Sequence, residues 1–278
     1  MSPSPARQRG VALITALLVV ALVTVAAVSL TAAHQLDLRR AATSQSFGQA
    51  HLHAHSAEAL AAELLGYLHA DPEVAAAIAR GSCTSPPAGL EIEGAFVTVY
   101  LEDLHCRINL NNLADAEDTE TEEGFVRLVE ALNRDDSAVR IDPEALVAAV
   151  REWIDPEVED DWYSWQDPPY RPANQPLASA SELLLVRGVD EAVYRALEPY
   201  VTALPATGTA LNTTAAPELL REAFQLPDAG DMDTDEQPGW GAYTRLSMAI
   251  ELDERVHRRC TVIHGPSGRI VLRRLRAC

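Results

Sequence analysis

The densest group of potential ligands in this sequence is an acidic segment near its middle. Six carboxylates fall within 13 residues: Asp155, Glu157, Glu159, Asp160, Asp161 and Asp167. Carboxylates this close repel one another unless water or a cation separates them, and Ca²⁺ accepts about six to eight oxygen ligands in irregular geometry. The segment therefore predicts a structural calcium site, with Asn174 and Glu182 as more distant ligands. A solvated acidic loop is the alternative.

The spacing of these acids is not that of an EF-hand. The sixth position of a frame that begins at Asp155 is Asp160, where an EF-hand needs glycine, and the twelfth is Gln166, where it needs glutamate. Several aromatic residues flank the acids, which argues against a disordered linker: Trp153, Trp162, Tyr163, Trp165 and Tyr170.

Three histidines form a second candidate site. His51 and His55 are four residues apart and would share one face of a helix, a spacing that suits zinc, with His53 between them. No cysteine or third ligand lies near in sequence, so a position at the junction of a membrane segment and a folded body is favoured. The sequence contains no G-x-S-x-G, H-E-x-x-H or Walker motif, and we predict that the protein is not an enzyme.

Charge is distributed unevenly along the chain. All 22 basic residues are arginine. Residues 1–90 are neutral, residues 91–240 carry a net charge of −24, and residues 241–278 carry +5. A body this acidic repels phosphate backbones, which excludes nucleic-acid binding.

The N-terminal region predicts a membrane anchor. Residues 11–33 are 23 consecutive uncharged residues, enough to span a bilayer as a helix. Arg7 and Arg9 precede them, which places the start of the chain in the cytoplasm. Helix-favouring composition continues to Asp71-Pro72, so one helix of roughly 60 residues and about 90 Å is expected.

The leader RQRG followed by VALITALLVVALVTVAAVSL resembles that of type IV pilin-like proteins. The resemblance implies that prepilin peptidase cuts between Gly10 and Val11, and that the mature protein is methylated. The family usually has glutamate at the fifth mature position, where this chain has Thr15. That glutamate is thought to neutralise the N-terminus of the preceding subunit, so its absence suggests a subunit with no predecessor, at the tip of a fibre.

Segments farther along resemble the type II secretion system protein K family: LHCRINLNNL at 104–113, LVAAVREWID at 146–155, DPPYRPANQPLASASELLLVRGVD at 167–190 and PYVTALPATGTALNTTAAPELL at 199–220. The resemblance implies a minor pseudopilin that binds calcium in its inserted domain. It implies assembly with minor pseudopilins I, J and H and the major pseudopilin, to initiate and cap the pseudopilus. It also implies an inner-membrane, single-pass protein whose body lies in the periplasm. A membrane-anchored periplasmic enzyme and a DNA-uptake pseudopilin are the alternatives.

The expected fold is α+β: a type IV pilin-like fold with a long N-terminal helix, an antiparallel sheet and an inserted all-α domain. The boundaries are a leader at 1–10, a membrane segment at 11–33, the rest of the long helix and the first strands at 34–110, the inserted domain at 111–225, and an acidic linker with the last strands at 226–278. Strands are predicted over 95–103, about 106–110 and after Tyr243. Helices are predicted over 122–132, 143–153, 179–185, 191–197 and 217–224.

The four cysteines all follow the membrane segment, on the oxidising side, so we predict disulfides. Three pairings are possible. We favour Cys83–Cys106 and Cys260–Cys278, which close the shortest loops. A hairpin that turns at 265–268 would place Cys260 opposite Arg273, which is an objection to the second pair.

Overall fold

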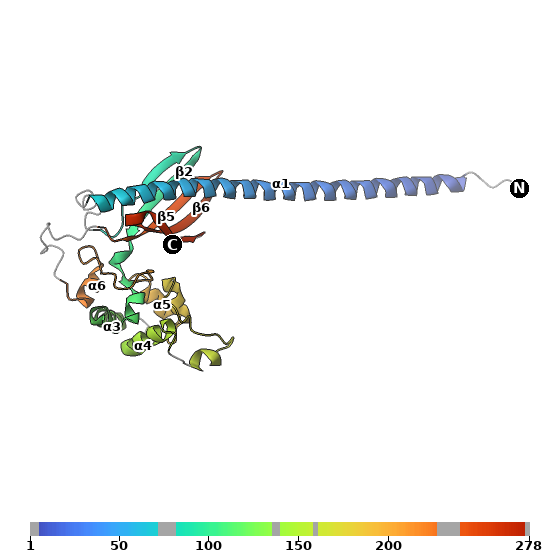
Figure 1. The fold of residues 1–278 in the computed structure, drawn as a ribbon. Helices are drawn as coiled ribbons and strands as arrows, with labels where there is room; N and C mark the ends of the chain where they lie inside the picture. The colour runs from blue at the N-terminus through green and yellow to red at the C-terminus, as the bar shows by residue number, and fades with distance from the viewer. Residues whose placement is uncertain (1–5, 72–81, 135–139, 158–160, 227–239, 276–278) are drawn as a thin grey trace.

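The computed structural model describes residues 6–71, 82–134, 140–157, 161–226 and 240–275. Its first element is helix α1, Ala6–Ala70, which ends just before Pro72 as predicted. From Val11 to Gln45 every side chain of α1 is exposed, and Ser46 is the first buried one. The N-terminal half of the helix therefore extends away from the body, and only the C-terminal part packs on it (Figure 1).

The C-terminal part of α1 lies on a five-stranded antiparallel sheet of order β1-β2-β5-β6-β7. The strands are β1 (Ala88–Ile92), β2 (Ala95–Asp103), β5 (Tyr243–Leu252), β6 (Arg255–His264) and β7 (Arg269–Arg274). The strand predicted over 95–103 and the C-terminal strands are confirmed. The edge strand β1 was not predicted, because its sequence AGLEI is short and does not alternate clearly.

Small side chains allow α1 to approach the sheet closely. Ala50, Ala54, Ala57 and Ala61 recur every three or four residues and are buried, so they form one face of the helix. They pack against apolar side chains of the central strands: Val97, Leu246, Met248, Ile250 and Ile263. The alanine face of α1 and these strand side chains together form the core of the pilin-like body.

A mostly helical domain lies between β2 and β5 in the sequence. It contains α3 (Thr119–Arg134), α4 (Pro143–Ile154), α5 (Glu191–Leu197) and α6 (Glu218–Ala223). The 3-10 helices η1 (Leu104–Cys106), η2 (Leu110–Ala114), η3 (Asp161–Trp165) and η4 (Ala180–Leu185) complete it. The helices predicted in this region are confirmed, except that 180–185 is a 3-10 helix.

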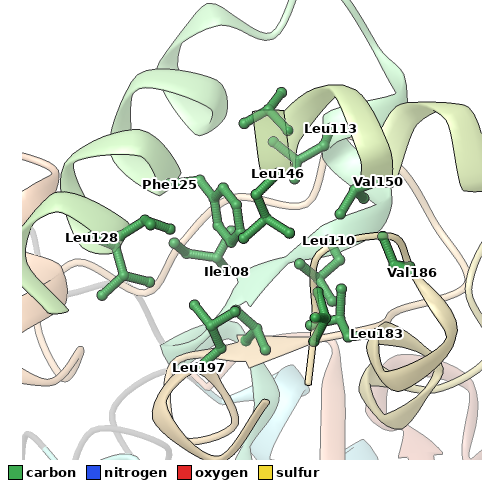
Figure 2. Close-up of a cluster of buried hydrophobic side chains, with 14 of the residues drawn as sticks. Ile108, Leu110, Leu113, Phe125, Leu128, Leu146, Val150, Leu183, Val186 and Leu197 are labelled. Atoms are coloured by element: carbon green, nitrogen blue, oxygen red, sulfur yellow. The ribbon is translucent and has the colours of Figure 1, made fainter. Parts of the chain in front are cut away.

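One apolar core holds this helical domain together. Figure 2 shows side chains from η2, α3, α4, η4 and α5 meeting at its centre. Phe125, Leu128, Val150, Leu183 and Leu197 in this core are completely buried. The helical domain, although rich in acidic residues, thus has a well-buried apolar core.

Two details of strand pairing differ from the sequence expectation. The short strand expected at 106–110 is β3 (Ile108–Asn109), which pairs in parallel with β4 (Val201–Thr202) within the helical domain and not with the larger sheet. In the last hairpin, an irregularity between Val262 and Ile263 shifts the register. Cys260 consequently lies opposite Arg274, so its predicted position opposite Arg273 was wrong by one residue.

Candidate assembly and calcium-binding regions

The exposed part of α1 has the character of a membrane anchor. It is long and apolar enough to cross a bilayer, with a mean hydropathy of 2.9 over its most apolar stretch. Thr15, at the position where pilin-like proteins usually have glutamate, donates its hydroxyl proton to the carbonyl oxygen of Ala12 at 3.0 Å. The side chain therefore satisfies its own hydrogen bond within the helix and leaves no polar group that needs a partner.

The acidic segment begins where α4 ends. Asp155 is the C-cap of this helix, and its Oδ1 accepts a hydrogen bond from the backbone N–H of Glu157 at 2.8 Å. The backbone N–H of Asn174 donates to the carbonyl oxygen of Trp153 at 3.0 Å. The structure thus brings Asn174, 19 residues downstream in sequence from Asp155, to the same helix end.

Aromatic packing fixes the loop that follows. Tyr163 is fully buried, with ring centroids 5.4 Å from both Trp153 and Tyr170. The backbone N–H of Tyr170 donates to the carbonyl oxygen of Tyr163 at 3.1 Å, which closes the loop between them. Burial raises the pKa of Tyr163 to about 12. Asp161 and Asp167 lie near the two ends of this closed loop.

The predicted calcium ligands are brought together only in part. Asp155, Glu157 and Asn174 share the end of α4, whereas Oε1 of Glu182 accepts the backbone N–H of Ala178 at 3.0 Å. Glu159 and Asp160 lie outside the described residues. Within the described ranges, no group of three or more acidic, histidine or cysteine side chains is close enough to hold a metal ion. The oxygen donors are of the kind that Ca²⁺ prefers, and the undescribed acids lie between them in sequence.

Two carboxylates at the end of β2 join the sheet to the helical domain. Glu102 pairs with Arg107 at 2.6 Å and with Arg245. Asp103, which is fully buried, accepts hydrogen bonds from the Asn212 side chain at 2.8 Å and from the Gly241 N–H at 3.1 Å. Sequence reasoning missed this junction, because the partners of Asp103 lie about 110 to 140 residues away in the chain.

The described cysteines are oxidised. Cys83 and Cys106 form a disulfide with a Cα–Cα distance of 5.9 Å, the pairing favoured from loop length. It links the segment before β1 to η1, beside the junction made by Glu102 and Asp103. Cys260 is also disulfide-bonded, while Cys278, its favoured partner, lies outside the described residues.

The histidines lie on the part of α1 that packs against the sheet. His53 is buried, and the rings of His51 and His55 contact each other with centroids 4.4 Å apart. His55 also pairs with the buried Glu58 at 3.1 Å. These two contacts lie within α1, and Arg259 of β6 reaches the pair from the sheet through Nδ1 of His51.

A long, half-exposed apolar helix packed through a small-residue stripe onto an antiparallel sheet defines a type IV pilin-like protein. The model of type II secretion system protein K matches residues 106–206. Protein K of Aeromonas hydrophila is 30% identical over 262 residues, covering 86% of this chain and 79% of the relative. Protein K of Pseudomonas aeruginosa is 32% identical over 238 residues, covering 79% of this chain and 69% of the relative.

A solved structure has the same fold. It is a chain of the GspK-GspI-GspJ complex of enterotoxigenic Escherichia coli, matched with a TM-score of 0.69 and 21% identity over 86% of this chain and 100% of that chain. The chain belongs to the type II secretion system protein K family and is a minor pseudopilin.

Proposed function

We propose that this minor pseudopilin occupies the tip of the pseudopilus, where it initiates assembly and blocks further growth. Thr15 is the observation that carries this proposal, since a subunit without a predecessor has no N-terminus to neutralise. A glutamate there would place an unpaired carboxylate in the bilayer, at a cost of several kcal/mol. The helical domain beside the sheet adds bulk that a subunit stacked above would meet (Figure 1).

We infer that the partners are minor pseudopilins I and J, with H and the major pseudopilin below them. The solved neighbour contains its protein K with I and J, which supports this set. Prepilin peptidase would cut between Gly10 and Val11, after which α1 anchors the protein once in the inner membrane. The Cys83–Cys106 disulfide favours a body in the oxidising periplasm. In this role the protein binds and positions subunits and performs no catalysis.

Fibre length tests the tip role. Expression of this chain is varied while the major pseudopilin is held constant, and pseudopilus length is measured by electron microscopy. A capping subunit predicts no fibres in its absence and progressively shorter fibres in excess. A second arm uses Thr15→Glu, with Thr15→Val as control. The glutamate variant should form less complex with I and J, and the valine variant should match the native chain. Fibre lengths independent of dose would contradict the tip role.

We also propose that the acidic segment binds structural calcium through Asp155, Glu157, Glu159, Asp160, Asp161 and Asp167, with Asn174 as a further ligand. Asp155 and Glu157 at the end of α4 and the closed aromatic loop that follows support this proposal. Calcium bound only to the folded state should add about 2.7 kcal/mol at a hundredfold excess over Kd. Tryptophan-detected melting with calcium and with chelator measures the shift. Glu157→Gln should reduce it and Glu251→Gln, on the sheet, should not; an unchanged melting point in chelator would remove the site.

A further inference from the structure

A cavity of about 200 Å³ lies between helix α1 and strand β6, away from the helical domain. Phe47 and His51 of α1 line one side, His257 and Arg259 of β6 line the other, and Leu275 closes the rim. Neither the membrane anchor nor the acidic segment uses this cavity.

Arg259 gives the cavity its chemistry. Its side chain is 5% exposed, and its Nη1 is buried without a hydrogen-bond partner. Its Nη2 donates to Nδ1 of His51. Within the part of the chain that the structure describes, Arg259 forms no ion pair. A buried guanidinium without a counter-ion carries a desolvation penalty that no neighbouring charge offsets.

The nearest buried acid is already committed to other partners. Glu58, which is 1% exposed, accepts hydrogen bonds from Thr261 at 2.7 Å and from Arg273 at 2.9 Å. Glu58 Oε2 also pairs with His55 Nδ1 at 3.1 Å. Glu58 therefore neutralises Arg273 and does not pair with Arg259.

The hydrogen bonds assign a donor and an acceptor nitrogen to each of the two histidines. Because arginine can only donate, Nδ1 of His51 accepts, so its Nε2–H donates to Nε2 of His55 at 3.0 Å. His55 Nδ1–H then donates to Glu58. Arg259 is thus joined to Glu58 through the imidazoles of His51 and His55, and an imidazole supplies no negative charge to Arg259.

We propose that this cavity binds a carboxylate on an apolar stem, with the carboxylate paired to Arg259. The lining is more polar than apolar, because His257 and Arg258 also contribute to it. Phe47, Ala50, Ile250 and Leu275 supply the apolar part of the wall, which suits a stem of a few carbons. Nη1 of Arg259 carries two N–H donors and has no hydrogen-bond partner, so it can donate to a carboxylate. The guanidinium gains the counter-ion that none of the described residues supplies.

The position of the cavity argues against a lipid headgroup as the ligand. Phe47 is 14 residues beyond Ala33, the end of the uncharged run, which is about 21 Å along the helix. Headgroups occupy only about 5–8 Å on each side of the hydrocarbon core. The carboxylate therefore comes from an acidic side chain of a neighbouring protein or from a small soluble molecule.

Bound carboxylate should be visible at His51. Desolvation and the adjacent Arg259 lower the pKa of His51. The other charged or titratable groups around His51 are His55, Glu58 and Arg273, together with His257 and Arg258 in the same cavity lining. An anion on Arg259 offsets the effect of this guanidinium, so the pKa of His51 should rise on binding. A rise of one unit corresponds to about tenfold tighter binding at low pH than at high pH.

The test uses the full chain in nonionic detergent, with imidazole signals followed by NMR and assigned with His51→Gln. Sodium butyrate is titrated against sodium chloride at equal ionic strength. We expect a saturable butyrate shift of the His51 signal and a raised His51 pKa. Arg259→Met should weaken butyrate binding at least tenfold, while Arg269→Met, an exposed arginine on the same hairpin, should not change it. Equal effects of chloride, or unchanged binding in Arg259→Met, would overturn the proposal.

Melting separates a binding role from a structural one. Because Arg259→Met removes a buried charge that lacks a counter-ion, its melting point should equal or exceed that of the native chain. A fall of more than about 10 °C would mean that Arg259 holds the fold, and the proposal would be wrong. Blocked Leu-Glu-Leu and Leu-Gln-Leu peptides test whether the carboxylate comes from a protein side chain or from a small molecule. Glu-dependent binding tighter than that of butyrate indicates a protein side chain, and tighter butyrate binding indicates a small molecule.

Discussion

One buried amide holds two distant segments of the helical domain together. Asn111 of η2 is 1% exposed, and its Nδ2 donates to the carbonyl oxygens of Leu177 at 2.9 Å and Leu204 at 2.8 Å. Its Oδ1 accepts the N–H of Leu177 at 2.8 Å. The Asn111 side chain thus satisfies three buried backbone groups, which a neighbouring strand would satisfy in a regular sheet.

Replacing this side chain should destabilise the domain strongly. Asn111→Ala removes three hydrogen bonds, each worth about 1 kcal/mol net, and leaves buried backbone groups that cost about 1–3 kcal/mol each if unsatisfied. Allowing for partial relaxation and water entry, we expect a loss of about 3–5 kcal/mol. For a body of this size the melting point should fall by about 10 °C.

Asn133 provides a matched control. Its Nδ2 donates to the carbonyl oxygen of Ile141 at 2.7 Å and its Oδ1 accepts the Ile141 N–H at 3.0 Å, but the residue is only half-buried. Water can replace these bonds, so Asn133→Ala should cost about 1 kcal/mol or less. Thermal melting of both full-length variants, detected by tryptophan fluorescence, measures the difference. If Asn111→Ala melted within about 2 °C of the native chain, the assigned role of this amide would be refuted.

Three further results are expected. Burial alone would raise the pKa of Glu58, but hydrogen bonds from Arg273 and Thr261 outweigh it and lower this pKa. The stabilisation that Glu58 provides is therefore present at neutral pH and is lost as pH falls below about 5. Urea unfolding at pH 7 and pH 4 should show a smaller difference in stability for Glu58→Gln than for the native chain. Cys106→Ser should cost about 3 kcal/mol in non-reducing melts, and reductant, which also breaks the disulfide of Cys260, should lower the melting point of the native chain at least as far. A Cβ at Gly124 would lie 2.3 Å from the Phe224 ring, so Gly124→Ala should cost about 1–3 kcal/mol in the same melting assay, and an unchanged midpoint would contradict the packing.

The features that the sequence predicted well are those set by neighbouring residues. The stop of α1 follows from Pro72, which disfavours helix at the residue before it. The start of α4 follows from Asp142, whose Oδ1 accepts the Ala145 N–H at 3.1 Å, and from Pro143 in the first turn. Such signals act within a few residues, so they can be recognised in the sequence without knowledge of the tertiary structure.

The features that were missed depend on partners far away in the chain. Ile108 reads as a strand residue, but whether it joins the larger sheet or pairs with Val201 is decided by packing in the helical core. Arg259 reads as one arginine of a basic strand, and nothing nearby reveals that it is buried without a counter-ion. The acidic segment was visible in composition, yet the approach of Asn174 to the end of α4 is a tertiary contact.

The last hairpin shows how a single irregularity alters a conclusion drawn from a correct turn. The turn at 265–268 was located properly, and His264 does pair with Arg269. Regular pairing from there puts Cys260 opposite Arg273, but the bulge after Val262 moves it opposite Arg274. Cys278 is then four residues from the position opposite Cys260 instead of five. The geometric objection to a Cys260–Cys278 bridge is therefore weaker than uniform pairing suggests, because the bulge shortens the chain that must fold back.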